Sequence, residues 1–401
     1  MKKLLTFALL AVISAGAYAQ KENKDSVNPN KPVFTTVKAN KITSIKDQNK
    51  SGTCWCFSTL SYLESEILKK TGKEYDLCEM FVVNKTYMDR AKASVRMHGD
   101  ISYSEGGSAY DPIFCAMNYG LCPEKAMPLP GTLYGDTLTD FGEMTKVATA
   151  YVDAIAKGQF KKLSPIWQQG LQGIFDTYLG KCPENFVYQG KQYTPKTFAA
   201  SLGLNWDDYV SITSYTHHPF YKPFIVEVQD NWRWAESYNV PMDDMMRIID
   251  NAINDGYTIA WGTDVTETGF SRSGLGIMLD ENKTREMAGT DADHWFKLDK
   301  GGKLNKIDSL GVTAPEMTIT QDMRQKAFDN WETTDDHGML IYGIAKDQNG
   351  KEYYMVKNSW GNYGKYKGTW YVTKAFVQYK TMDYMVNKNA IPKDIRKKLG
   401  I

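Results

Sequence analysis

Three residues in this sequence have types and settings suited to chemistry: a cysteine, a histidine and an asparagine far apart in the chain. Cys54 follows a short loop and opens a run in which apolar residues recur every three or four positions, the spacing of one helix face. Thr53 is expected to cap this helix, and Gly72 to end it. A thiol in the first turn faces unpaired N–H groups and the positive end of the helix dipole, which favour thiolate. The position predicts a nucleophile for acyl transfer.

The residues around Cys54 decide between two interpretations of it. Most cysteines in proteins are small buried hydrophobes, and for an isolated cysteine that would be the preferred interpretation. Here Gln48 lies upstream, and its side-chain N–H could join the backbone N–H of Cys54 in holding an oxyanion. Trp55 and Phe57 are expected to pack beneath the site and fix the start of the helix. The combination favours the nucleophile.

An activated thiol needs a base, and His337 has the setting of one. It precedes a strand pattern that turns at an Asn-Gly dipeptide and returns over 353–357 to Asn358. Asn358 is expected to accept the ring N–H of His337 and to aim the other ring nitrogen at Cys54. A plain hairpin would leave the two residues roughly 13 Å apart, so a bulge or a folded-back loop must close the gap. His294 is a competing base, without an amide-bearing partner.

These segments resemble a known family. The pattern formed by Gln48, Cys54, Trp55 and Phe57 is similar to the nucleophile segment of papain-like cysteine peptidases. Ser51 stands where papain has an additional disulfide-forming cysteine, which favours the bleomycin hydrolase, or aminopeptidase C, branch. The resemblance implies peptide substrates and amide hydrolysis through a thioester acyl-enzyme. It implies no metal and no organic cofactor.

Further site residues follow from the same resemblance. The paired glycines Gly106 and Gly107 would suit a plain turn, but they resemble the glycine pair that binds the substrate backbone in papain-like enzymes. Trp55 and Trp360 are counted with them as residues around the substrate. By the family match, Trp360 covers the hydrogen bond between Asn358 and His337 and keeps water from it.

The predicted fold class is α+β: a papain-like two-lobe fold, with a helical lobe, a barrel-like β lobe and an inserted helical segment. A hydrophobic content of 42% is ample for such a core. The expected divisions are a signal peptide at 1–19, an N-terminal arm at 20–40, a helical lobe with the nucleophile at 41–134, a mostly helical insertion at 135–205, a β lobe with the histidine and asparagine at 206–390, and a short tail at 391–401.

The first residues predict export. Two lysines precede the apolar run 4–13, and small residues at 17 and 19 suggest cleavage before Gln20. A membrane-spanning helix would need about 20 apolar residues, which this run lacks. No cysteine follows the cleavage site, so no lipid anchor is expected. We expect a periplasmic or extracellular protein.

Composition argues against other partners. With 48 basic and 47 acidic residues, the chain has no global field for nucleic acid or an anionic membrane. Adjacent His217 and His218 could bind metal, but neighbours in a strand point to opposite faces, so no shared ion is expected. Six cysteines are present. Their pairing is open, with Cys115 and Cys122 as one possible bridge and Cys56 expected in the core.

Two functional alternatives stay open. In the bleomycin hydrolase branch a C-terminal arm enters the cleft and anchors the substrate amino end, which gives aminopeptidase activity. Here the similarity reaches residues 391–395 and the arm looks shortened, so an endopeptidase or a dipeptidyl-peptidase is the rival. A non-catalytic peptide-binding protein on the same fold is a further alternative. Family members form hexamers, which makes a homo-oligomer an expectation from the resemblance.

Overall fold

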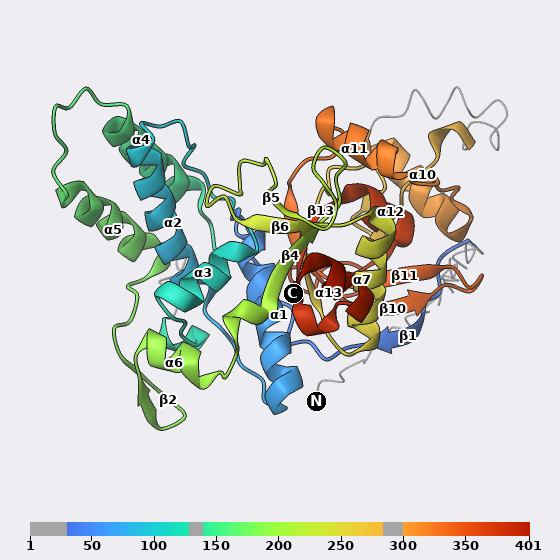
Figure 1. The fold of residues 1–401 in the computed structure, drawn as a ribbon, viewed down its shortest axis with the longest axis horizontal. Coiled ribbons are helices and arrows are strands. Elements are labelled where there is room, and N and C mark those ends of the chain that lie inside the picture. Colours follow the sequence, from blue (N-terminus) through green and yellow to red (C-terminus); the bar gives the residue numbers. More distant parts are fainter. Residues whose placement is uncertain (1–29, 128–138, 284–299) are drawn as a thin grey trace, which may run out of the picture.

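The computed structural model describes residues 30–127, 139–283 and 300–401. A group of helices lies on one side of the molecule, and a large sheet with its own helices lies on the other (Figure 1). The predicted signal peptide and His294 lie outside the described residues. Within the described part of the chain, no helix is both long enough and apolar enough to cross a membrane.

Helix α1 (Cys54–Thr71) is the centre of the helical side. Its residues from Trp55 to Leu68 are all buried, and Gly72 ends it in a left-handed conformation with φ 71°. The helix therefore has the bounds that its apolar spacing predicts. The other elements of this side are α2 (Glu79–Arg96), α3 (Tyr110–Asn118), α4 (Gly142–Ala156), α5 (Ile166–Leu179), α6 (Pro195–Ser201), β2 (Phe186–Tyr188) and β3 (Lys191–Tyr193).

The other side is built on a sheet with the strand order β5-β6-β4-β13-β7-β10-β11-β12-β9-β8, and β1 pairs with β10. Its strands are β1 (Thr35–Ala39), β4 (Tyr209–Thr213), β5 (Pro223–Ile225), β6 (Glu236–Asn239), β7 (Ile259–Thr263), β8 (Phe270–Ser271), β9 (Leu275–Gly276), β10 (His337–Lys346), β11 (Glu352–Lys357), β12 (Thr369–Thr373) and β13 (Thr381–Asn387). Its helices are α7 (Met242–Asn254), α10 (Lys300–Leu310), α11 (Gln321–Asp329), α12 (Lys374–Lys380) and α13 (Lys393–Leu399). The predicted hairpin is confirmed as β10 and β11.

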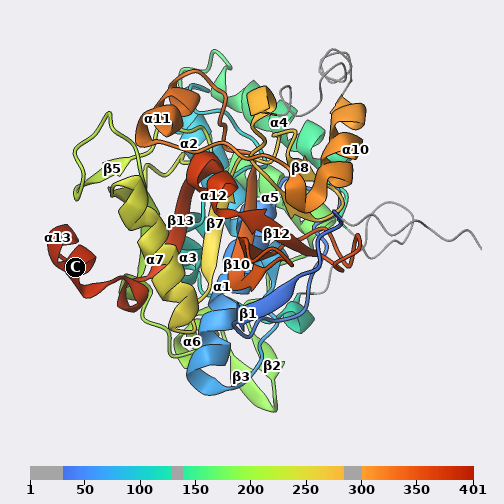
Figure 2. The same cartoon turned by 90° about the vertical axis from the view of Figure 1, so that its right-hand side faces the viewer.

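Helices lie around the central strands (Figure 2), and side chains on both faces of these strands are buried. Ala260 and Leu340 pack into the core that contains α1, whereas their neighbours Trp261 and Ile341 pack into the core that contains α7 and α12. This alternation is the two-residue period of a strand, which sends successive side chains to opposite faces. Strands β7 and β10 therefore join the helical side to the rest of the molecule.

A glycine lets β10 lie against the start of α1. A Cβ atom on Gly338 would lie 2.7 Å from Ser58 Oγ and 3.2 Å from the backbone oxygen of Cys54. The next residue towards the N-terminus is His337, which is the first residue of β10 and pairs with Thr263 of β7. The close approach therefore places the predicted base beside the predicted nucleophile.

Candidate active site

Cys54 is the first residue of α1, but the residue before it caps the helix differently from the expectation. Thr53 has φ −109° and ψ 18° and makes no side-chain capping hydrogen bond. Its hydroxyl lies 2.6 Å from that of Ser51 instead, and its carbonyl accepts from the N–H groups of Cys56 and Phe57. Thr53 therefore ends the loop at the N-cap position without the predicted cap.

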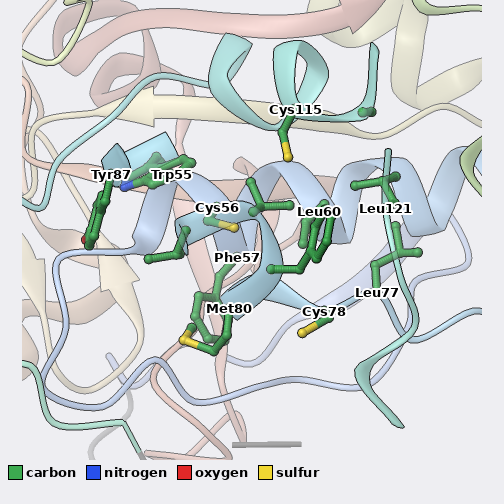
Figure 3. Close-up of a cluster of buried hydrophobic side chains, with 14 of the residues drawn as sticks. Trp55, Cys56, Phe57, Leu60, Leu77, Cys78, Met80, Tyr87, Cys115 and Leu121 are labelled. Atoms are coloured by element: carbon green, nitrogen blue, oxygen red, sulfur yellow. The ribbon is translucent and has the colours of Figure 1, made fainter. Parts of the chain in front are cut away.

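The residues after Cys54 anchor the helix in the core (Figure 3). Cys56 is fully buried, as predicted, and Trp55 and Phe57 are buried with it. All six cysteines are free thiols, so Cys115 and Cys122 are not bridged. Since the first turn of α1 is fixed by three consecutive buried side chains, the position of the Cys54 backbone is fixed as well.

Burial governs the acidity of the Cys54 thiol. It raises the thiol pKa to about 12, and the carboxylates of Asp335 and Asp230 act in the same direction. The backbone N–H groups of Gly338 and Trp55 lower the pKa, but they do not outweigh burial. The N–H group at the helix start thus favours the thiolate as expected, but burial outweighs it, and Cys54 needs a base.

His337 and Asn358 form the predicted hydrogen-bonded pair. Nε2 of His337 lies 2.8 Å from Oδ1 of Asn358, and both side chains are buried. With Nε2 engaged, Nδ1 is the ring nitrogen left for the thiol, and His337 and Cys54 line the same cavity. Burial lowers the imidazole pKa to about 4, against the opposing effect of the Asn358 hydrogen bond. The ring is thus neutral near pH 7 and able to accept a proton.

A bulge and a turned loop close the gap between these two residues, as the sequence required. The pairing of β10 with β11 shifts between Ile341 and Gly343, and its last pair is Leu340 with Lys357. Asn358 then leaves the ladder, and its N–H bonds to the carbonyl of Gly368 at 3.0 Å. The amide side chain can therefore reach back to the start of β10.

Trp360 lies over the imidazole. Its ring centroid is 4.9 Å from that of His337, with the planes tilted by 33°. Phe270 and Trp370 meet the Trp360 ring edge-on and fix its position. The side chain is thus placed to cover the pair formed by His337 and Asn358.

Gln48 lies between the nucleophile loop and the asparagine loop. Its Nε2 donates to the carbonyl of Ser51 at 2.7 Å, and its Oε1 accepts from Ser359 Oγ at 2.6 Å. It is buried and is not among the described residues that line the cavity with Cys54. The amide of Gln48 has two Nε2 hydrogens. One donates to the Ser51 carbonyl, and the other could donate to an oxyanion.

The paired glycines line the cavity with Trp55. A Cβ on Gly107 would lie 2.9 Å from the Trp55 ring, and one on Gly106 would lie 1.9 Å from the carboxylate of Asp230. The indole N–H of Trp55 bonds to the carbonyl of Glu105 at 3.0 Å, which holds the glycine segment in place. Only glycine fits at these two positions without displacing a neighbour.

Sequence reasoning missed four aspartates in this cavity. The cavity has a volume of about 270 Å³, and no Lys or Arg is among the described residues that line it. Its acidic residues are Asp230, Asp335, Asp336 and Asp383. Asp335 and Asp336 precede His337 directly, which was the available signal. The other two come from a loop and from β13, and sequence spacing does not relate them to the histidine.

The four aspartates of the cavity have raised pKa values. Burial raises the pKa of Asp335 well above its usual value, and the charges of Asp230, Asp383 and Asp336 add to this effect. Burial also raises the pKa of Asp336 to about 6, and the pKa values of Asp230 and Asp383 are raised for the same reason. Arg90 offsets part of this at Asp230, with its Nη1 3.2 Å from Oδ1. Such a cavity favours a cationic occupant.

Comparisons with known proteins agree with the predicted family. A family model described as the Peptidase C1-like family matches residues 5–333. Aminopeptidase G of Lactobacillus delbrueckii subsp. lactis is 22% identical over 393 residues, covering 88% of this chain and 82% of its own. Human bleomycin hydrolase is 20% identical over 401 residues, covering 88% and 81%.

A solved structure shares the fold. PepW from Lactobacillus rhamnosis matches with a TM-score of 0.65 and 18% identity, covering 91% of this chain and 84% of its own. At that identity the likeness concerns the fold alone. It confirms the predicted α+β class.

Proposed function

This chain belongs to the Peptidase C1-like family of papain-like cysteine peptidases, and we propose that it acts as an aminopeptidase on peptides. The observation that carries the proposal is the set of four carboxylates in the cavity that also contains Cys54 and His337. An aminopeptidase must recognise the ammonium group at the start of its substrate, and carboxylates provide that recognition.

The proposed reaction is acyl transfer through the thiol. Nδ1 of His337 takes the proton from Cys54 as the sulfur attacks the carbonyl carbon, and the imidazolium then protonates the leaving amine. A thioester forms and the amide C–N bond breaks. Water, deprotonated by His337, hydrolyses the thioester and regenerates the thiol. Asn358 holds the imidazole throughout, and the backbone N–H of Cys54 with the remaining Nε2 hydrogen of Gln48 would stabilise the oxyanion.

The carboxylates explain how the cut would be limited to the amino end. An ammonium group about 4 Å from one carboxylate gains roughly 1 kcal/mol in water and about 4 kcal/mol at an effective dielectric constant near 20. Several carboxylates with raised pKa values gain further, because the cation relieves their mutual repulsion. The curated relatives named as aminopeptidases support the same mode.

The C-terminal segment, as described, does not contribute to the cavity. Helix α13 packs against α7, where Asp394 pairs with Arg247 at 3.1 Å, and no cavity residue comes from 391–401. Among the described residues, the aspartates of the cavity wall are the groups with the charge to anchor the substrate amino end.

An endopeptidase is the second candidate, and one observation favours it. The same aspartates could bind a lysine or arginine side chain that precedes the scissile residue. Turnover of three fluorogenic amides separates the modes: Ala-AMC, acetyl-Ala-AMC and acetyl-Arg-Ala-AMC. We expect cleavage of Ala-AMC and almost none of acetyl-Ala-AMC. Equal rates on these two would sink the aminopeptidase proposal, and efficient cleavage of acetyl-Arg-Ala-AMC alone would establish the rival.

A non-catalytic binding protein is tested separately. We expect the epoxide inhibitor E-64 to label the native protein once, and Cys54→Ala to abolish the labelling. Cys182→Ala is the matched control, because Cys182 is a half-buried free thiol outside the cavity. A native protein that reacts with no epoxide would favour the binding module.

We further infer export through the signal peptide at 1–19. The supporting observation is the order of basic, apolar and small residues before Gln20. Mass spectrometry of the protein from the periplasmic and medium fractions should find a chain that starts at Gln20. A chain that retains residues 1–19 in the cytosolic fraction would refute it.

A further inference from the structure

Two histidines and a glutamate converge at the surface beside the catalytic cavity. Strand β4 ends at Thr213, and His217 lies in a turn beyond it. The expectation that His217 and His218 point to opposite faces is wrong, because it assumed a continuing strand. Nε2 of His217 lies 3.2 Å from one oxygen of Glu227, and Nε2 of His218 lies 3.3 Å from the other.

The spacing of these atoms suits a metal ion. One ligand atom from each of the three side chains lies within 4.8 Å of the other two. A tetrahedral zinc ion with bonds of about 2.0–2.2 Å separates its ligands by roughly 3.3–3.5 Å. The two distances between imidazole and carboxylate are already close to that value. We propose that His217, His218 and Glu227 bind a divalent transition-metal ion of the zinc class.

Packing holds the two rings in this arrangement. The His218 ring stacks on Phe224, with centroids 4.3 Å apart and planes at 20°. The His217 ring meets Phe224 edge-on at 5.4 Å and stacks with Phe328 at 5.8 Å. Since the rings are fixed by aromatic neighbours, little rotamer entropy remains to be lost when an ion binds.

His217 also has the hydrogen-bonded support that metal-binding histidines use. Its Nδ1 lies 3.0 Å from Nε2 and 3.3 Å from Oε1 of Gln325. Gln325 is buried, and its amide is held by the N–H of Thr216 and by Asp329. With Nε2 on the ion, Nδ1–H would donate to Oε1 of Gln325 at 3.3 Å, an amide oxygen that takes the place of the carboxylate, backbone carbonyl or water that usually orients a bound imidazole.

The exposure of the cluster leaves room for the rest of the coordination sphere. The side chains of His217, His218 and Glu227 are 30%, 38% and 57% exposed. Three protein ligands with water in the fourth position match the open zinc sites of proteins. An ion pair would explain why one histidine contacts Glu227. It would not explain why both imidazole rings contact the same carboxylate, one at each oxygen.

The location links the ion to the catalytic cavity. Val226, Val228 and Asp230 flank Glu227 in sequence and line that cavity. A second cavity of about 710 Å³ is lined by His217 and Glu227 and shares Asp230 and Asp335 with the first. The ion would therefore fix the loop that forms one wall of the substrate site.

Zinc titration calorimetry tests the proposal. The mature chain carries Cys54→Ala and Cys182→Ser, so that zinc does not bind the catalytic thiol or the half-buried one. We expect one zinc site, at least about tenfold weaker in Glu227→Gln and in His218→Ala. His98→Asn is the matched control, because His98 is exposed, lies just after α2 and outside the cluster, and has a left-handed conformation that asparagine tolerates.

Thermal unfolding gives the second measurement. Zinc should raise the Tm of the background protein and of His98→Asn, and should leave the Tm of Glu227→Gln unchanged. A cobalt complex without a sulfur-to-metal charge-transfer band would show ligation by nitrogen and oxygen. Absence of zinc binding in the background protein, or equal affinity in Glu227→Gln, would overturn the proposal.

Discussion

Nε2 of His337 lies 2.8 Å from Oδ1 of Asn358, although the two residues are 21 positions apart and their strands are out of register for a direct pair. Because Asn358 accepts at Nε2, it fixes the tautomer in which Nδ1 carries the lone pair. The amide thus acts through the imidazole, as a positioning residue.

The substitution Asn358→Ala tests that role. Loss of one buried hydrogen bond, worth about 1 kcal/mol, together with loss of the fixed tautomer should lower kcat at least about tenfold, with KM nearly unchanged. Steady-state kinetics on Ala-AMC measures both constants. Asn118→Ala is the matched control, because Asn118 is exposed and its side chain donates to the Phe114 carbonyl of its own helix. A normal kcat in Asn358→Ala would contradict the assignment.

A second prediction concerns the contact that brings base and nucleophile together. In Gly338→Ala the new methyl would lie 2.7 Å from Ser58 Oγ and 3.2 Å from the Cys54 carbonyl, so β10 must move away from α1. We expect kcat/KM on Ala-AMC to fall at least about tenfold and stability to fall by roughly 1–3 kcal/mol.

Gly173→Ala is the comparison for this substitution. Gly173 lies in α5, and a Cβ there meets nothing within 4 Å. Alanine should stabilise this helix by about 0.5–1 kcal/mol and leave kcat unchanged. If Gly338→Ala kept full activity, the close approach of β10 would not be what positions His337.

The third prediction concerns recognition of the substrate ammonium. Asp383 accepts from Ser211 Oγ at 3.0 Å and lines the cavity. Asp383→Asn keeps the shape and removes the charge, so KM for Ala-AMC should rise about tenfold, the equivalent of roughly 1.4 kcal/mol, with a smaller effect on kcat.

Two controls make the test of Asp383 specific. Asp322→Asn removes a charge from the exposed surface of α11 and should change neither constant. The rate of Cys54 alkylation by iodoacetamide, which has no ammonium group, should be similar in Asp383→Asn and the native protein. An unchanged KM in Asp383→Asn would refute the ammonium subsite.

The sequence predicted the parts of this site that rest on local patterns. The helix of Cys54 and the hairpin of His337 have strong periodicity and a clear turn, so their bounds could be read directly. The aspartates could not be found this way, because 230, 335 and 383 lie in different segments that meet only in the folded sheet. The pKa of Cys54 was missed for a related reason: the spacing of apolar residues shows that a thiol starts a helix, but not which groups surround that thiol in the folded protein.

His217 and His218 illustrate a different failure. The sequence pattern predicts a strand that continues past Thr213, whereas the chain turns there, so the alternation of side chains along a strand does not apply to these two residues. The convergence on Glu227 depends on where β4 ends and on the return of the chain through β5. Element boundaries are the least certain part of a sequence-based prediction, and here a shift of a few residues changed where the two imidazole rings point.

The final prediction is that the charge of Asp335 in the cavity lowers the stability of the folded protein. The pKa of Asp335 is raised well above its usual value of about 3.8 by burial and by neighbouring carboxylates. A carboxyl whose pKa is higher in the folded state than in the unfolded state binds its proton more tightly when folded. Its contribution to stability is therefore fully present below the unfolded pKa and is lost as pH rises through the folded value.

Asp335→Asn should therefore increase stability at neutral pH. Asparagine keeps the size of the side chain and carries no charge, so the free energy of unfolding at pH 7 to 8 should rise by on the order of 1 kcal/mol. Urea unfolding measured from pH 4 to 8 should show a gain that shrinks towards pH 4, where aspartate itself is protonated in the folded protein. KM for Ala-AMC should rise in the same variant. Two results would contradict this prediction: a variant that is less stable than the native protein at pH 8, or a gain in unfolding free energy that does not depend on pH. Either would show that the charge of Asp335 does not destabilise the folded protein.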